Sequence, residues 1–120
     1  IAAYAAHMAA LLGAHIIKVK PPTDVLEQPE ATKVYEQVNL PRAELAERIR
    51  HIMQASFAGR RIVVFAGGAA KDRSGLLEEI RGLRDGGANG SIIGRNTFQR
   101  PRDEALDLLS EIIGIYKSAS

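Results

Sequence analysis

The sequence predicts an α/β protein built on parallel strands. Helical segments and short apolar strands alternate along the 120 residues, beginning and ending with a helix. A helix between successive strands requires parallel pairing through right-handed crossovers. Three such strands form only an incomplete sheet, with an open edge and an uncovered face. We therefore expect residues 1–120 to be a single partial domain that needs further polypeptide or a partner.

The first predicted helix covers residues 2–12, where alanine and leucine dominate. Gly13 is the type of residue that ends such a helix. A strand over residues 15–20 follows and stops at two prolines, which cannot donate to a β-ladder. Because the chain opens at Ile1 directly in helical sequence, without an N-cap, we expect it to be the tail of a longer protein.

A long connection precedes the second predicted strand. It contains a short predicted helix over residues 29–38 and a stronger one that begins at residues 39–41 and runs through Phe57. The apolar residues of the stronger helix recur at helical spacing: Leu45, Ile49, Ile52 and Met53. Residues 61–66 then form a continuous apolar run, which is typical of a strand buried on both faces.

The last third of the chain predicts two helices around a short strand. Ser74 is expected to cap the first helix, with Glu78 completing a partial capping box, and residues 86–87 to end it. The strand covers residues 90–94, and an amphipathic helix over residues 102–116 closes the chain. Its predicted apolar face consists of Leu106, Leu109, Ile112 and Ile113.

Composition excludes several classes of function. The net charge is +2, with acidic and basic residues interspersed, so we expect no nucleic-acid partner. The chain lacks cysteine and its three histidines are scattered, so we expect no metal, no cofactor and a reducing, cytoplasmic environment. The apolar stretch near the start is shorter than a membrane span, so we expect no membrane association.

The end of the first strand carries two amines, Lys18 and Lys20. Side chains two apart share one face of a strand, so both should point away from the helices, together with Ile16. Neighbouring amines withdrawn from water disfavour each other's protonation, and a neutral lysine is required to form a Schiff base with a ketone. The alternative is a solvated strand end, which most such pairs are.

The other two strands end in Gly67-Gly68 and in Gly94-Arg95. Glycine lets backbone N–H groups approach an anion, and arginine adds a fixed positive fork. Taken singly, each feature also fits an ordinary turn or a surface ion pair. Together, at adjacent strand ends, they match the phosphate site that many (β/α)8 barrels build from the loops after their last two strands.

These residues resemble a known family. Ile16-Ile17-Lys18, Ala66-Gly67-Gly68 and residues 86–99, which read GGANGSIIGRNTFQ, are similar to the C-terminal part of class I fructose-bisphosphate aldolases of the archaeal and bacterial type. The resemblance covers essentially the whole chain, and residues 94–99 are fairly specific. It implies that the three strands are the sixth, seventh and eighth of a (β/α)8 TIM barrel.

The same resemblance implies roles for individual residues. Lys18 would form the Schiff base, with Lys20 as a possible additional site residue, and the substrate phosphate would be held by Gly67, Gly68, Gly94 and Arg95. Relatives often have serine at the position of Ala66, which removes one possible hydroxyl donor. Acid and base residues would come from earlier strands of the barrel.

The implied reaction is cleavage of fructose 1,6-bisphosphate to dihydroxyacetone phosphate and glyceraldehyde 3-phosphate, without a metal. The implied partners are a phosphorylated ketose, the missing N-terminal part of the barrel and further copies in a homo-oligomer. Two alternatives remain open. One is another Schiff-base aldolase or a thiolase of the same superfamily, and the other is an inactive half-barrel that needs a partner.

Overall fold

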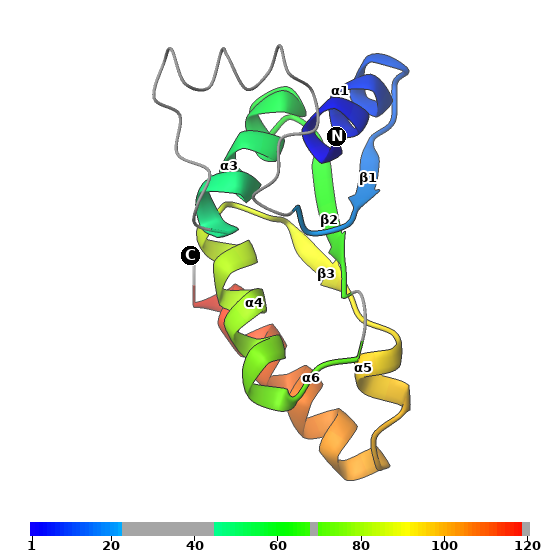
Figure 1. Cartoon of the computed structure of the whole chain (residues 1–120), viewed down its shortest axis with the longest axis vertical. Helices are drawn as coiled ribbons and strands as arrows, with labels where there is room; N and C mark the ends of the chain where they lie inside the picture. Colours follow the sequence, from blue (N-terminus) through cyan, green and yellow to red (C-terminus); the bar gives the residue numbers. More distant parts are fainter. Residues whose placement is uncertain (23–44, 68–69, 119–120) are drawn as a thin grey trace.

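The computed structural model describes residues 1–22, 45–67 and 70–118 (Figure 1). Its elements, in chain order, are α1 (Ala2–Leu11), β1 (Ile16–Val19), α3 (Leu45–Ala55), β2 (Ile62–Ala66), α4 (Arg73–Asp85), β3 (Gly90–Ile92), α5 (Arg95–Phe98) and α6 (Arg102–Lys117). The helix predicted over residues 29–38 and the predicted start of α3 lie outside the described residues. The predicted alternation of helices and strands is confirmed.

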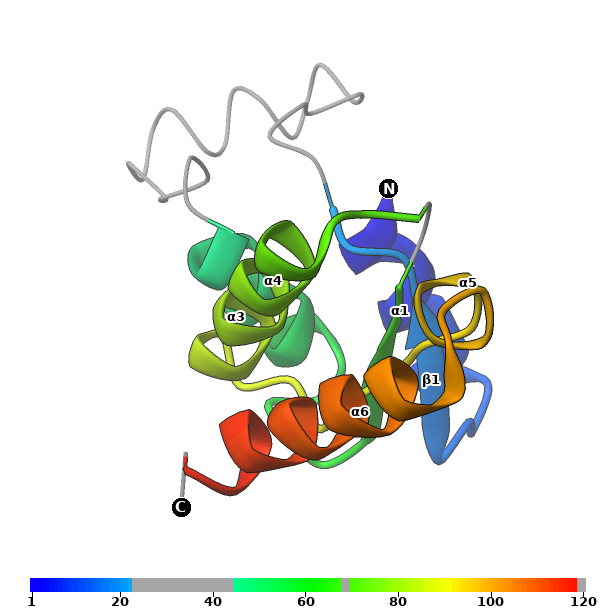
Figure 2. The same ribbon diagram turned by 90° about the horizontal axis from the view of Figure 1, so that it is seen from below.

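The three described strands form one parallel sheet in the order β1-β2-β3. In its register Ile16 lies opposite Ile62, and Val64 lies between Lys18 and Gly90. Helices α1, α3, α4 and α6 form a row in which each helix contacts the next, and Figure 2 shows the same arrangement from below. Neighbouring strands therefore follow chain order and all end at the same edge of the sheet.

The hydrophobic core lies between the sheet and this row of helices. Its largest fully buried side chains are Phe65, Ile49, Ile52, Leu76, Ile80, Leu83, Leu108 and Val63. On the opposite face of the sheet, Ile16, Ile62 and Ile92 are 65%, 48% and 49% exposed. The prediction that β2 is buried on both faces is therefore wrong for the described chain, because no described element covers the second face.

Helix α4 starts at a different cap from the one predicted. The Asp72 carboxylate accepts a hydrogen bond from the Gly75 amide at 3.4 Å, so Asp72 is the N-cap, and Ser74 lies exposed within the first turn. The prediction of a Ser74 cap is wrong because the helix begins one residue after Asp72. Its predicted end is confirmed, since Gly86 is the C-cap and Gly87 has φ of 91°.

Helix α3 ends at Ala55, two residues before the predicted end. Phe57 has φ of 64°, which takes it out of the right-handed helical region. Its ring instead packs edge-on against the imidazole of His7, with 5.9 Å between centroids, and under the guanidinium of Arg61 at 5.1 Å. These contacts, of which the one with His7 is long-range, accompany the early end of the helix.

Helix α6 buries a different stripe from the one predicted. The buried residues are Ala105, Leu108, Ile112 and Ile115. Of the predicted apolar face only Ile112 is buried, whereas Leu106 and Ile113 are 48% and 54% exposed. The helix carries two adjacent apolar stripes, and packing against α4 selects the one that faces the core. Between β3 and α6 the chain also forms the short helix α5, which was not predicted.

Candidate active site

Lys18 projects from the face of the sheet that no described helix covers. On β1 the exposed residues Ile16 and Lys18 alternate with buried Ile17 and partly buried Val19. The predicted orientation of Lys18, away from the helices and on the side of Ile16, is therefore confirmed. Lys20 is also exposed and follows the last residue of β1.

Gly67 lies directly beside the segment that follows β3. Its amide donates to the Ile92 carbonyl oxygen at 3.0 Å, and its own carbonyl oxygen accepts from Asn96 Nδ2 at 3.2 Å. A Cβ at this position would stand 3.6 Å from Ile92 O and 3.7 Å from Asn96 Nδ2, which is ordinary van der Waals contact. Because its amide is already engaged, Gly67 would offer a ligand a close backbone approach rather than a donor.

Asn96 ties the loop after β2 to the loop after β3. The side chain is 2% exposed, and its Oδ1 accepts from the Lys71 amide at 2.7 Å while Nδ2 bonds Gly67. Arg100 reinforces the link, since its guanidinium donates to Asn96 O at 2.8 Å and to Lys71 O at 2.9 Å. The amine of Lys71 is paired with Glu79. The sequence analysis did not predict this role of Asn96, for which the only signal is an amide two residues after Gly94.

Gly94 and Arg95 lie at the same edge of the sheet as Gly67. Gly94 is the N-cap residue of α5, where its carbonyl oxygen accepts from the Thr97 and Phe98 amides at 2.8 Å and 3.1 Å. Arg95 is exposed and begins α5. The structure thus brings Gly67 close to the residues after β3, whereas Gly68 lies outside the described residues.

Lys18 lies deeper in the sheet than these loops. Its partner in the register is Val64, three residues before Gly67. At about 3.3 Å per residue, the Lys18 backbone lies about 10 Å below the level of Gly67. The flexible four-carbon stem of lysine can carry the amine part of this way toward the loops. Lys18 thus shares its face of the sheet with the exposed residues Ile16, Ile62 and Ile92, here called the apolar floor. Arg95 and the glycine-containing loops lie at the carboxyl edge of the sheet, here called the rim.

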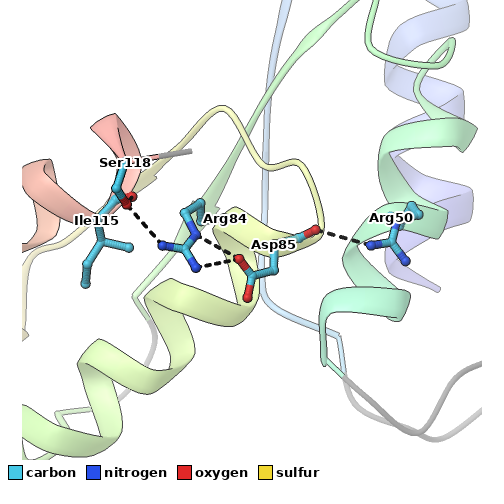
Figure 3. A network of polar contacts seen from close by, with 5 residues as sticks. All are labelled: Arg50, Arg84, Asp85, Ile115 and Ser118. Carbon is cyan, nitrogen blue, oxygen red and sulfur yellow. Dashed lines mark hydrogen bonds and ion pairs between the residues drawn. The ribbon is translucent and has the colours of Figure 1, made fainter. Parts of the chain in front are cut away.

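A separate polar network joins α3, α4 and α6 at the other edge of the sheet, where α4 ends and β3 begins (Figure 3). The guanidinium of Arg84 donates to the Asp85 carboxylate at 2.8 Å and to Ser118 Oγ at 3.2 Å. Ser118 Oγ donates in turn to Ile115 O at 2.7 Å, and Arg50 donates to Asp85 O at 3.3 Å. The network holds helix ends together and is remote from the rim of glycine loops.

An open groove of about 570 Å³ runs beside the start of β3, along α6. Its lining includes Ser91, Leu109, Ile113 and Tyr116. The Tyr116 hydroxyl lies 2.6 Å from Ser91 Oγ, and burial raises the pKa of the Tyr116 phenol while this hydrogen bond opposes the rise. Among the strands that the structure describes, β3 lies at the edge of the sheet, and the groove flanks that edge.

Among the residues that the structure describes, no group of three or more histidine or acidic side chains converges as a set of metal ligands. In the same part of the chain, every helix is too short or too polar to cross a membrane.

Comparison with known proteins gives consistent matches. The sequence model of one family, described as "DeoC/LacD family aldolase", matches residues 2–100. Two curated relatives, each a class 1 fructose-bisphosphate aldolase from a strain of Halobacterium salinarum, are 33% identical over 98% of this chain. The chain spans 36% of the length of these relatives.

Solved structures show the same correspondence. An archaeal fructose 1,6-bisphosphate aldolase superposes with a TM-score of 0.67 and 25% identity, over 95% of this chain and 37% of its own. A Schiff base-forming fructose-1,6-bisphosphate aldolase gives a TM-score of 0.63, over 100% of this chain and 37% of its own, and at 23% identity supports the fold alone. The predicted fold class, part of a (β/α)8 barrel, is confirmed.

Proposed function

Because the chain belongs to the DeoC/LacD family of aldolases, we propose that it is part of a class I aldolase that cleaves fructose 1,6-bisphosphate through a Schiff base on Lys18. Since the chain spans about a third of its relatives' length, the activity is that of a longer protein. The position of Lys18 supports this proposal. It projects from the uncovered sheet face, below the rim where Asn96 joins two glycine loops.

The proposed reaction uses the Lys18 amine as nucleophile. The neutral amine adds to the ketone carbon, an acid protonates the resulting hydroxyl, and loss of water gives a protonated imine. A base removes the proton of the hydroxyl on the fourth carbon, the bond between the third and fourth carbons breaks, and its electron pair moves onto the iminium to form an enamine. Glyceraldehyde 3-phosphate leaves, the enamine takes a proton, and hydrolysis releases dihydroxyacetone phosphate and the free amine.

The apolar floor around Lys18 supports this chemistry. Ile16, Ile62 and Ile92 lie on the same uncovered face of the sheet as Lys18. If further strands complete the barrel, these side chains enclose the amine in an apolar interior. Attack on the ketone carbon requires the uncharged form of the amine.

The rim supplies the proposed phosphate site. Arg95 offers a charged fork, and Gly67, Gly68 and Gly94 allow close approach of the backbone to a phosphate. Anchoring the phosphate holds the ketone near Lys18, so that the attack becomes effectively intramolecular. The acid and base residues would come from the rest of the barrel, together with the strands that cover the free edges of β1 and β3. Lys20 would sit at the mouth of the site.

A second candidate is another Schiff-base aldolase of the same family. The description of the matching family does not name fructose 1,6-bisphosphate, and the proposed phosphate site suits any phosphorylated ketose. Assay of the full-length protein on a panel of phosphorylated ketoses separates the two candidates. Preference for fructose 1,6-bisphosphate by at least about 10-fold in kcat/KM, equivalent to about 1.4 kcal/mol, supports the first.

Replacement of Lys18 tests the role of the nucleophile. Lys18→Met removes the amine and keeps the length of the side chain, so kcat in the full-length enzyme should fall by at least about 1,000-fold. Lys20→Met is the matched control, because Lys20 follows β1 and its loss should lower kcat by less than about 10-fold. Near-normal turnover by Lys18→Met would rule out the proposed mechanism.

The same proposal includes cytoplasmic expression of the full-length protein and its assembly into a homo-oligomer.

A further inference from the structure

Helix α1 presents an apolar outer surface that the described fold does not use. Ile1, Tyr4, Met8 and Leu11, here called the outer stripe, are 68%, 58%, 44% and 64% exposed. The helix contains no aspartate, glutamate, lysine or arginine. By contrast, the exposed residues of α4 are mainly charged or polar: Arg73, Ser74, Glu78, Arg81 and Asp85. A helix that is apolar on all sides is normally buried on all sides.

The outer stripe points away from the sheet. Successive side chains of an α-helix turn by about 100°, so Tyr4 and Met8, each two residues from buried Ala6, point about 160° away from it. One flank of the helix faces α3, because His7 Nδ1 lies 2.7 Å from Ala55 O. Within Ala2–Leu11 the opposite flank carries small side chains, Ala2, Ala5 and Ala9, and Leu12, the C-cap residue, follows on this flank and is 89% exposed.

Further helices that extend the row beyond α1 would leave the outer stripe uncovered. Helices on a sheet touch their neighbours through their flanks, and α1 is at one end of the row formed with α3, α4 and α6. A further helix of the same layer would therefore lie against the alanine flank. At the other end of the row, Leu109, Ile113 and Tyr116 of α6 line the groove beside β3. The α6 stripe thus suits a neighbour within the layer, whereas the outer stripe of α1 does not.

The chemistry of the outer stripe favours a second copy of the same surface. Its members are spaced by three, four and three residues, the a and d spacing with which two helices pack side by side. Because α1 carries no charged side chain, two copies can meet about a two-fold axis without burying a charge. We propose that the outer stripe of α1 is the apolar centre of an interface between two copies of this protein.

The stripe alone is too small for a stable interface. A helix of ten residues is about 15 Å long, whereas a standard interface buries about 800 Å² on each partner. A polar rim must therefore surround it, contributed by side chains outside α1. The proposed interface does not depend on the reaction that the protein catalyses.

Sedimentation of the full-length protein tests the proposal. The unmodified protein should sediment as a dimer or a larger even assembly. The double variant Tyr4→Glu, Met8→Glu places like charges opposite each other, so the dissociation constant should rise by about 100-fold or more. Ser110→Glu, on the exposed surface of α6, is the matched control and should leave the assembly unchanged. A monomeric unmodified protein, or a folded double variant with unchanged assembly, would show that other residues of its own chain cover the stripe.

Covalent pairing provides the second test, for the case in which the double variant does not fold. Met8→Cys, in a background without other accessible cysteines, should form a disulfide-linked dimer on mild oxidation. At equal protein concentration, Met8→Cys should form this disulfide at least about 10-fold faster than Ser110→Cys, because only Met8→Cys holds two thiols face to face. Equal rates for the two variants would overturn the proposal.

Discussion

The side-chain amide of Asn96 holds together the two loops on which the proposed phosphate site depends. It bonds the Lys71 amide and the Gly67 carbonyl oxygen from a position that is almost fully buried. An asparagine amide can accept through oxygen and donate through nitrogen at the same time, which no apolar residue of similar size can do. Asn96 is thus a positioning residue, distinct from the groups expected to touch the substrate.

Asn96→Ala should lower the free energy of unfolding by about 2–4 kcal/mol, because it leaves a buried N–H and a buried C=O unpaired. The same change should raise KM for the phosphorylated substrate by about 10-fold or more, since the loops lose their tie. Asn89→Ala is the matched control: Asn89 Oδ1 accepts from the Val63 amide at 2.8 Å, at the opposite edge of the sheet. Asn89→Ala should reduce the free energy of unfolding and leave KM unchanged. A KM that moves equally in both variants would argue against a positioning role.

Arg95 is the charged group of the proposed phosphate site. Arg95→Ala should raise KM for a phosphorylated ketose by about 10- to 100-fold, the effect of losing one or two charge-assisted hydrogen bonds. Arg95→Lys should recover only part of the loss, because an ammonium lacks the planar fork. Steady-state kinetics of the full-length enzyme measure both effects. An unchanged KM in Arg95→Ala would remove this residue from the phosphate site.

At the scale of the elements, glycines decide where helices can end and how closely they pack. Gly86 caps α4 beneath α3, and a Cβ there would lie 2.4 Å from the Ile49 Cβ and 2.6 Å from the Ala46 carbonyl oxygen. Gly114 lies inside α6, and a Cβ there would meet nothing within 4 Å. The same residue type is thus required at one position and dispensable at the other.

Gly86→Ala should lower the free energy of unfolding by about 1–3 kcal/mol, because α3 and α4 must move apart to admit the methyl group. Gly114→Ala should instead raise it by about 0.5–1 kcal/mol, since alanine favours the helix and the space is open. Chemical denaturation of the two variants measures the difference. A gain in stability from Gly86→Ala would contradict the close packing of α3 on α4.

The sequence predicted the features that depend on periodicity, but not those that depend on contacts between elements. Alternation along β1 predicted that Lys18 faces away from the helices, because the side-chain period of a strand depends only on the backbone. The apolar face of α6 was mispredicted because the helix carries two stripes and only its contact with α4 decides between them. Similarly, Asp72 and Ser74 are both good capping residues, and local sequence does not choose between them.

At the scale of the whole molecule, the described chain is one-sided. Its helices cover one face of the sheet, while the other face exposes three isoleucines and the free edge of β3 borders an apolar groove. Two thirds of the relatives' length lies beyond the matched part, which is enough polypeptide to complete a barrel. Such a completion would enclose Lys18 and would leave the outer stripe of α1 for contacts with another copy.

Stability should depend on pH through His51. Burial lowers the pKa of the His51 imidazole. The unfolded chain therefore binds a proton more readily than the folded one. The free energy of unfolding should be constant above about pH 7 and fall as the pH drops below about 6.5. His51→Gln should weaken this dependence in the full-length protein, whereas His15→Gln, at an exposed position, should not. Identical pH profiles for the two variants would contradict the burial of His51.

Borohydride trapping is the most direct test of the central claim that Lys18 forms a covalent intermediate. The full-length protein is incubated with fructose 1,6-bisphosphate, reduced with sodium borohydride, digested, and its peptides are sequenced by mass spectrometry. We expect irreversible inactivation that requires substrate, with the reduced adduct on the Nζ of Lys18 and none in Lys18→Met. Full activity after reduction in the presence of substrate, or an adduct on a different lysine, would contradict it.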